Sequence, residues 1–344
     1  MTFFVGIDSG GTHTNMRLIT PEGEQKSIPE LDRSLSSNRS NTDLREVLRD
    51  IFASILSFTR GEATCVWINA AGYSAATKKR FDDLLQEVVG DVGNLQIGIS
   101  NDAIGLLLAH DSEYVVTIAG TGSVSMARTP SGGVVKRGGD EWVVADYGSA
   151  FWLGLTGIRS AYSAWEGGPD TALLKCLLER YRSFSEENDE HDTGPQVQAI
   201  ARSLGSLGSN LKPIVASFAP DVTRQAELGD EESQKIVRRA ADELASASAR
   251  VYREVAAQAE GRVVMPRFLI SGSVAYRSPF YLETVKSSLD QFLFDVRENI
   301  DHAVELNHQL NGLSEALSLA KRLEDGPPIP QLVAQFPYAV LRSS

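Results

Sequence analysis

The arrangement of a short strand, a glycine-rich turn and a second strand occurs twice in this chain, and it is the feature that most narrows the possible folds. The first copy has an apolar run over 3–7, the turn Asp8-Ser9-Gly10-Gly11-Thr12 and an alternating strand over 15–19. The second copy has a strand over 115–119, the turn Gly120-Thr121-Gly122 and a strand over 123–128. Because self-similar segments indicate repeated structural units, the pattern predicts two similar halves, each presenting one glycine hairpin.

Strands alternate with helices between the two copies. The periodicity predicts helices over 41–58, 75–89 and 103–110, and strands over 64–70 and 96–100. Such alternation is typical of an α/β domain with a largely parallel sheet. The region from residue 149 onward is mostly helical and ends with a helix near 312–323.

The length of 344 residues favours two domains. We place the first at 1–112 and a larger second domain at 113–344. The C-terminal segment of the second domain is a candidate for packing back on the first.

Composition excludes several classes of protein. The chain has 33 Lys and Arg against 45 Asp and Glu, a net charge of -12, which argues against a broad nucleic-acid or anionic-membrane surface. Its two cysteines, Cys65 and Cys176, form no paired motif, so a disulfide framework and a sequence-evident zinc or iron–sulfur site are excluded. No stretch reaches the roughly 18 apolar residues of a membrane span, and the N-terminus lacks a basic leader. We therefore expect a cytoplasmic protein.

The two glycine turns predict a phosphate clamp. Glycine lets the backbone approach an anion and turn successive N–H groups toward it, and the hydroxyls of Thr12, Thr14, Thr121 and Ser123 add donors. The alternative is a pair of ordinary β-turns. The common P-loop, dinucleotide-binding and protein-kinase motifs are absent from the sequence.

Three carboxylates follow strands or begin loops. Asp8 ends the first strand beside its glycine turn, where a carboxylate can orient the waters of Mg²⁺ next to phosphates. Asp102 follows the strand over 96–100, at the edge where α/β proteins bind ligands. The alternative for Asp102 is a helix N-cap for 103–110, and Asp146 is open to the same interpretation before its own helix.

Taken together, these segments resemble the sugar-kinase, heat-shock-protein and actin superfamily, and within it the N-acetylglucosamine kinase branch that is grouped with the BadF/BadG/BcrA/BcrD ATPases. The matching segments occur in family order over residues 3–276. They are Gly6-Ile7-Asp8-Ser9-Gly10-Gly11-Thr12, Asn101-Asp102-Ala103, Ala119-Gly120-Thr121-Gly122-Ser123, Asp146-Tyr147-Gly148-Ser149-Ala150-Phe151-Trp152 and Ile270-Ser271-Gly272-Ser273-Val274. Each motif alone is weak, whereas five in order are specific.

The resemblance implies an α/β fold of two actin-like, ribonuclease-H-like domains with a nucleotide cleft between them. It implies ATP and Mg²⁺ as cofactors, and phosphorylation of an amino sugar, N-acetylglucosamine or glucosamine, at its 6-hydroxyl by a homodimer. Asp102 would be the general base and Asp8 would hold Mg²⁺ through water. The nucleotide would contact Asp8, Gly10, Gly11, Thr12, Gly120, Thr121, Gly122, Ser217, Gly272 and Ser273. The sugar would contact Asn38, Asn101, Asp140, Glu141 and Asp146.

The chain departs from the family pattern in the segment expected to recognise the sugar. Asp140 and Glu141 replace an aromatic-plus-glycine pair, and the family's Gly-Asp-Glu-Gly-Ser is here Ala-Asp-Tyr-Gly-Ser over 145–149. Two added carboxylates would favour the amine of glucosamine over a neutral acetamide. The alternative is that both side chains point to solvent. ATP use is therefore better supported than the identity of the sugar.

Other functions are compatible with the same motifs. An ATPase that energises a partner redox enzyme would need clustered cysteines for an iron–sulfur cluster, and Cys65 and Cys176 lack that spacing. A sugar-sensing regulator would need a DNA-binding module ahead of the first strand, which begins near residue 3. A non-catalytic or differently specific ATP-binding sugar sensor remains the main alternative to a kinase.

Overall fold

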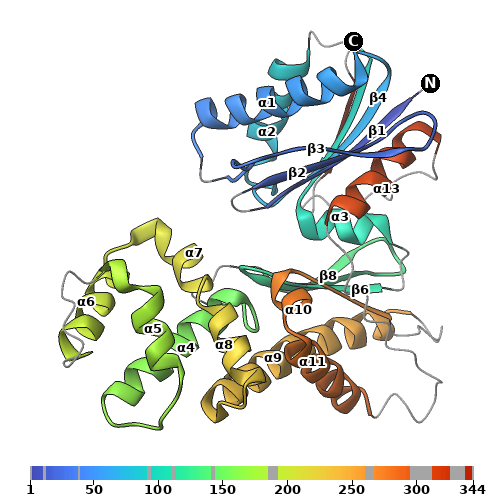
Figure 1. Cartoon of the computed structure of the whole chain (residues 1–344). Coiled ribbons are helices and arrows are strands. Elements are labelled where there is room, and N and C mark those ends of the chain that lie inside the picture. The colour runs from blue at the N-terminus through green and yellow to red at the C-terminus, as the bar shows by residue number, and fades with distance from the viewer. Residues whose placement is uncertain are drawn as a thin grey trace. The chain divides into compact units, whose positions relative to one another are not determined.

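The computed structural model describes residues 2–10, 13–37, 39–90, 94–110, 114–140, 144–184, 193–259, 267–294, 312–325 and 338–342 (Figure 1). The chain divides into two compact units that interleave in sequence. Unit 1 comprises Met1–Tyr114, Ala127–Val135 and Leu310–Ser344, and unit 2 comprises Val115–Met126 and Lys136–Gln309. The C-terminal residues thus belong to the same unit as the N-terminal strands.

Unit 1 is built on a sheet of six described strands in the order β10-β5-β4-β1-β2-β3. Their bounds are β1 Phe3–Ser9, β2 Thr14–Ile19, β3 Gln25–Leu31, β4 Thr64–Ala70, β5 Leu95–Ser100 and β10 Tyr338–Arg342. Only β1, β4 and β5 pair in parallel, while β2, β3 and β10 run antiparallel to their neighbours. The prediction of a largely parallel sheet is therefore wrong, because short turns between β1, β2 and β3 force antiparallel pairing.

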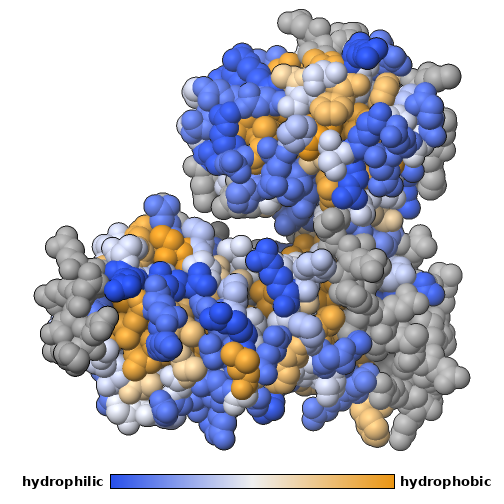
Figure 2. Space-filling view, viewed as in Figure 1, coloured by the Kyte–Doolittle hydropathy of each residue, from blue (hydrophilic) through white to orange (hydrophobic). Residues whose placement is uncertain are grey.

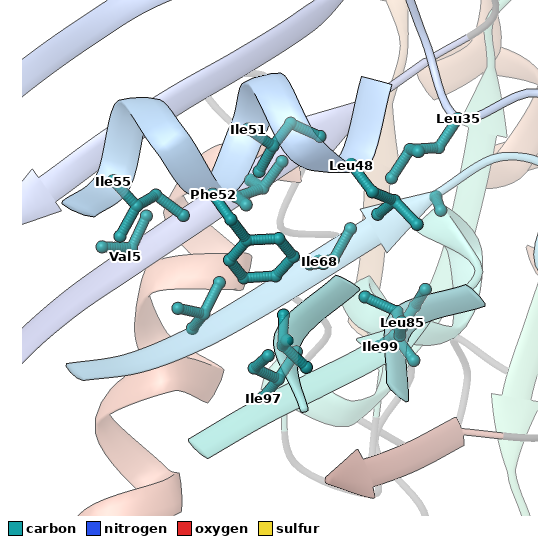
Figure 3. Packing of buried hydrophobic residues seen from close by; sticks show 14 of the residues in the cluster. Val5, Leu35, Leu48, Ile51, Phe52, Ile55, Ile68, Leu85, Ile97 and Ile99 are labelled. Atoms are coloured by element: carbon teal, nitrogen blue, oxygen red, sulfur yellow. The ribbon is translucent and has the colours of Figure 1, made fainter. Parts of the chain in front are cut away.

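One face of this sheet is covered by α1 (Asn41–Thr59) and α2 (Lys78–Val89). The helix α1 begins at a capping box in which the Ser40 hydroxyl accepts from the Asp43 backbone N–H. Apolar residues of α1 then pack onto alternate residues of β1, β4 and β5, as Figure 3 shows. The fully buried side chains there include Val5, Ile51, Ile55, Ile68, Ile97 and Ile99.

The opposite face of the sheet carries α3 (Asp102–Ala109) and α13 (Gly312–Asp325), which contact each other (Figure 1). Gly6 allows α13 to lie directly against β1, since a Cβ there would approach the Leu317 backbone nitrogen to 2.6 Å. Side chains alternate along a strand, so Gly6 and Asp8 share the face that α13 covers, whereas Val5 and Ile7 face α1 and α2. The fold thus directs Asp8 toward α13 and α3.

Unit 2 combines most of a second sheet with a helical layer. The four described strands have the order β8-β7-β6-β9 and the bounds β6 Tyr114–Ala119, β7 Ser123–Arg128, β8 Val134–Gly138 and β9 Arg267–Ser271. The helices are α4 Ala150–Trp165, α5 Leu173–Arg180, α6 Thr193–Gly205, α7 Leu211–Ala216, α8 Ala219–Glu227, α9 Glu231–Ala257, α10 Ser273–Arg277 and α11 Pro279–Phe292. The long helix α9 packs against both α8 and α11.

The visible surface is mostly hydrophilic. Figure 2 shows hydrophilic residues over much of the drawn face, with hydrophobic residues in smaller groups. In the part of the chain that the structure describes, no helix has the length and apolar character needed to span a membrane.

Candidate active site

The parallel strands of unit 1 bring three polar residues to one edge of the sheet. The register pairs Asp8 of β1 with Asn69 of β4, and Asn69 with Ser100 of β5. Ligand sites of α/β proteins lie at the carboxyl ends of such strands. Asp102 follows Ser100 by two residues and begins α3. The sheet therefore places Asp8 and Asp102, the two carboxylates singled out by sequence, at the same edge.

Asn101, and not Asp102, is the N-cap of α3. The Asn101 side chain accepts a hydrogen bond from the Ala103 backbone N–H at 3.0 Å. The Asp102 Oδ1 accepts from the same N–H at 2.9 Å, but Asp102 is already the first helical residue. The N-cap alternative for Asp102 is therefore wrong, and its carboxylate is left for another role.

Burial raises the pKa of the Asp102 carboxyl, and the backbone N–H groups of Ala103 and of Asp102 itself partly oppose that rise. The carboxyl is a stronger base than an exposed aspartate as a result. This is the environment in which proteins adjust a carboxylate for accepting a proton.

Asp8 lies half-buried against α13. A Cβ at Gly312, the first residue of α13, would approach the Asp8 Oδ1 to 2.7 Å. Burial, followed by the negative charges of Asp102 and Glu315, raises the pKa of Asp8 to about 7. Glu315 lies one helical turn after Gly312 and is only 3% exposed, and its Oε2 has no hydrogen-bond partner among the described residues. Three carboxyl groups are thus gathered on the face covered by α13.

Replacing Asp8 by Asn should stabilise the ligand-free protein increasingly as pH rises. With a pKa of about 7 in the folded state, Asp8 retains a proton that the unfolded chain releases near 3.8, so the free energy of unfolding falls as pH rises between these values. The advantage of Asp8→Asn should therefore grow by about 2–3 kcal/mol between pH 5 and pH 8. Denaturant unfolding of both proteins across that range measures this change in the free energy of unfolding. A difference between the two proteins that does not vary with pH would show that the pKa of Asp8 is not raised in the folded protein.

A buried hydrogen-bond network fixes α13 to the strand edge. The Asn69 Nδ2 donates to the Gly312 carbonyl at 2.8 Å, and the Asn69 Oδ1 accepts from the Trp67 Nε1 at 3.1 Å. The same indole N–H reaches the Ser100 Oγ at 3.2 Å. Sequence reasoning missed Asn69, Gly312 and Glu315. The one available signal was Glu315, a charged residue on the apolar stripe of its helix.

The second glycine turn, between β6 and β7, presents two backbone N–H groups in one direction. The Gly120 and Thr121 carbonyls accept from the Ala150 and Phe151 N–H groups at the start of α4, at 2.8 and 3.2 Å. In a trans peptide the N–H points opposite to the carbonyl, so the Thr121 and Gly122 N–H groups point away from α4. Among the described residues, neither has a hydrogen-bond acceptor. Two consecutive N–H groups that point in the same direction are able to bind an anion.

Gly272 packs directly against the backbone at the start of this turn. Its φ is +107°, and a Cβ there would approach the Ala119 carbonyl oxygen to 2.4 Å and the Gly120 nitrogen to 2.8 Å. Ser273, the next residue, begins α10. Ser217 lies at the C-terminal end of α7, is exposed, and donates its Oγ hydrogen bond to the Ile214 carbonyl. The structure therefore brings Gly272 to the turn, whereas the Ser217 side chain is engaged within its own helix.

Asp146 lies beside the same turn and is 3% exposed. Its backbone has a φ of +62°, in the left-handed region. Its Oδ1 accepts from the Ser123 N–H at 3.3 Å, and its Oδ2 pairs with the Lys212 Nζ at 2.9 Å. Both carboxylate oxygens are thus engaged within unit 2, and the N-cap of α4 is Ser149. Sequence reasoning missed Lys212, for which the sequence carried no signal.

Asp140 is exposed and forms an ion pair with Lys136 at 2.6 Å. This geometry favours the alternative in which its side chain points to solvent.

In the first glycine turn, the Gly10 N–H donates to the His13 carbonyl at 3.2 Å. The remaining predicted site residues, Gly11, Thr12, Asn38 and Glu141, lie outside the described residues.

Comparison with known proteins decides the family. The model of the BadF/BadG/BcrA/BcrD ATPase family matches residues 5–304. The chain belongs to this family. The match begins within β1 and extends through the Asp102 edge, both glycine turns and the Gly272 segment, whereas α13, which carries Gly312 and Glu315, lies beyond it.

Two curated relatives are similar along most of their length. N-acetyl-D-glucosamine kinase of Dictyostelium discoideum is 27% identical over 259 residues, covering 70% of this chain and 76% of that protein. N-acetylmuramic acid/N-acetylglucosamine kinase of Clostridium acetobutylicum is 26% identical over 253 residues, covering 71% and 77%. The predicted resemblance to the N-acetylglucosamine kinase branch of these ATPases is confirmed.

A solved structure shows the same fold. The proposed N-acetylglucosamine kinase of Porphyromonas gingivalis superposes with a TM-score of 0.64 at 18% identity, covering 94% of this chain and 99% of that chain. The predicted fold class, α/β with two actin-like domains, is confirmed. The curated kinases and this shared fold support the prediction of a kinase-like enzyme.

Proposed function

We propose that this protein transfers the γ-phosphoryl group of ATP to the 6-hydroxyl of an amino sugar, with N-acetylglucosamine as the first candidate. The observation that carries the proposal is the Asp102 carboxylate. It lies at the strand edge beside Asp8, its pKa is raised by burial, and Asn101 serves as the helix cap in its place. Membership of an ATPase family and similarity to two sugar kinases support this reaction over other uses of the same fold.

Asp102 would act as the general base. In phosphoryl transfer the protein mainly positions the reactants and stabilises charge, and a carboxylate that accepts the hydroxyl proton suffices for base catalysis. The raised pKa of Asp102 increases its affinity for that proton. We expect the sugar hydroxyl to donate its hydrogen bond to this carboxylate before transfer.

The phosphates would bind at the two glycine turns. The Thr121 and Gly122 N–H groups supply two parallel donors. Gly10, Gly11 and Thr12 would supply the other turn, and Ser217, Gly272 and Ser273 remain our proposed nucleotide contacts. Gly272 has a second role in supporting the Gly120 backbone.

Magnesium would be held through water by Asp8. Among the described residues, no three His, Cys, Asp or Glu side chains come together as a metal cage. Mg²⁺ commonly binds one or two carboxylates and keeps several waters beside substrate phosphates. The ion supplies charge neutralisation for the phosphates when bound. Asp8 offers the hard oxygen donor that such a site needs.

The sugar contacts proposed are Asn38, Asn101, Asp140, Glu141 and Asp146. The contacts of Asn101 and Asp146 within their own units show how each is oriented, and neither excludes a further hydrogen bond to a hydroxyl. The exposed Asp140 gives no support to a preference for glucosamine. A homodimer and a cytoplasmic location remain predictions.

A coupled assay of ADP release over a panel of sugars tests the function. We expect ADP release to depend on N-acetylglucosamine and to be weak with glucose, and N-acetylmuramic acid, glucosamine and N-acetylmannosamine should define the specificity. ADP release at the same rate without any sugar would indicate an ATPase and contradict the kinase. Saturable sugar binding without ADP release would favour a non-catalytic sensor.

A further inference from the structure

The buried carboxylate of Asp146 lies beside the Gly120–Gly122 turn. A Cβ on Gly122 would approach the Asp146 Oδ2 to 2.8 Å, so this carboxylate packs against the turn itself. Its other oxygen accepts from the Ser123 N–H, the next donor after the two free N–H groups of Thr121 and Gly122. Because charges interact strongly where water is excluded, an unneutralised Asp146 would repel any phosphate at this turn.

Lys212 is the group that offsets this charge. Its Nζ lies 2.9 Å from the Asp146 Oδ2, the same oxygen that faces Gly122. The Lys212 side chain is 29% exposed, so the pair is shielded from much of the solvent that weakens surface ion pairs. Lys212 reaches the turn from α7, whereas Asp146 precedes α4. The pair therefore joins two elements around the turn.

The backbone at Asp146 shows that this arrangement is held in place. A non-glycine residue with a φ of +62° is uncommon and persists only where the surroundings fix it. The loop is also fixed two residues later, where the Tyr281 hydroxyl donates to the Gly148 carbonyl at 2.7 Å. The Asp146 carboxylate is therefore buried, has both oxygens engaged and is held by a left-handed backbone, which fixes its position beside the turn.

We propose that Lys212 is a positioning residue of the phosphate turn. It keeps Asp146 oriented so that Asp146 holds the Ser123 N–H, and it cancels the charge that would otherwise repel the nucleotide phosphates. This proposal rests on the proposed function only because it assumes that the Gly120–Gly122 turn binds the nucleotide phosphates. Lys212 acts through Asp146 and need not touch the nucleotide.

Nucleotides with different numbers of phosphates separate this role from a merely structural one. In Lys212→Met the uncompensated Asp146 should weaken ATP binding by roughly 10- to 100-fold and ADP binding by less, because the repulsion grows with phosphate charge. Adenosine binding should stay within about twofold of wild type. Isothermal titration of the three ligands measures these values. Lys235→Met, which removes an exposed lysine paired with Glu232, is the matched control and should change none of them.

The double variant Asp146→Asn with Lys212→Met provides the decisive comparison. Asn tolerates left-handed backbone and can still accept from the Ser123 N–H, so this variant removes both charges while keeping the turn's hydrogen bond. It should restore ATP affinity to within about threefold of wild type. It also leaves no unpaired buried charge, so it should fold even where Lys212→Met does not.

Three results would overturn the proposal. The first is an unchanged ATP affinity in Lys212→Met, and the second is a loss of adenosine affinity in that variant as large as its loss of ATP affinity. The third is a double variant that binds ATP no more tightly than Lys212→Met, which would mean that Lys212 contacts the phosphates directly. Experiments on the wild-type protein test the proposed kinase function separately. Wild-type protein that binds ATP but phosphorylates no sugar would contradict the kinase alone, while wild-type protein that binds no ATP would contradict both.

Discussion

Replacing Asp102 by Asn should lower kcat for sugar phosphorylation by about 10²–10⁴-fold, the range for loss of a general base. The carboxamide keeps the size of the side chain and an oxygen for the Ala103 N–H, so α3 should form as before. ATP affinity should be unchanged, since Asp102 is proposed to act on the sugar hydroxyl. Steady-state kinetics with saturating sugar, together with ATP titration, measure both quantities.

Asp43→Asn is the control for this substitution. Asp43 also lies in the first turn of a helix, α1, and its variant removes the same charge. It should lower stability slightly and leave kcat unchanged. If Asp102→Asn kept near-wild-type kcat, the assignment of the base would be wrong, and Asp102 would be no more than a first-turn helix residue like Asp43.

Replacing Gly272 by Ala should both destabilise the protein and weaken nucleotide binding. Gly272 has a φ of +107° and a ψ of 159°, a region populated almost only by glycine. The added Cβ would also meet the Ala119 and Gly120 backbone, which cannot rotate away as a side chain does. We expect a loss of about 3 kcal/mol or more in the free energy of unfolding. ATP affinity should fall at least about tenfold because the turn itself is displaced.

Gly229→Ala separates backbone strain from displacement of the turn. Gly229 has a comparable φ of +97°, but nothing lies within 4 Å of the position of its Cβ. This variant should lose only about 1–2 kcal/mol of stability and keep its ATP affinity. Denaturant unfolding and ATP titration of the two alanine variants measure the difference. Equal behaviour of both variants would show that Gly272 does not shape the phosphate turn.

Local patterns predicted the elements that carry the site. The strand predicted over 64–70 is β4, and the helix predicted over 41–58 is α1, which ends one residue later at Thr59. The strand predicted over 96–100 begins one residue earlier in the structure, at Leu95. These succeed because hydrophobic periodicity and turn chemistry act over a few neighbouring residues. The same local reasoning located Asp8, Asp102 and the Gly120–Gly122 turn.

The environment of these residues depends on contacts between distant parts of the chain. A closing helix near 312–323 was expected, but nothing local shows that α13 packs on β1 and buries Asp8. The pair formed by Asp146 and Lys212 is likewise separated by 66 residues. The sequence also could not distinguish Asp102 from Asn101 as the cap of α3, because both residue types cap helices. Burial and pairing, which set the chemistry, therefore required the structure.

Identification of the phosphorylated product tests whether this protein transfers phosphate from ATP to the 6-hydroxyl of N-acetylglucosamine. The purified protein is incubated with Mg²⁺, ATP and N-acetylglucosamine, and the product is examined by phosphorus–proton correlation NMR. We expect one phosphate for each ADP formed, coupled to the two protons on carbon 6 of the sugar. Phosphate attached at carbon 1 or another ring position, or released only as inorganic phosphate, would contradict it.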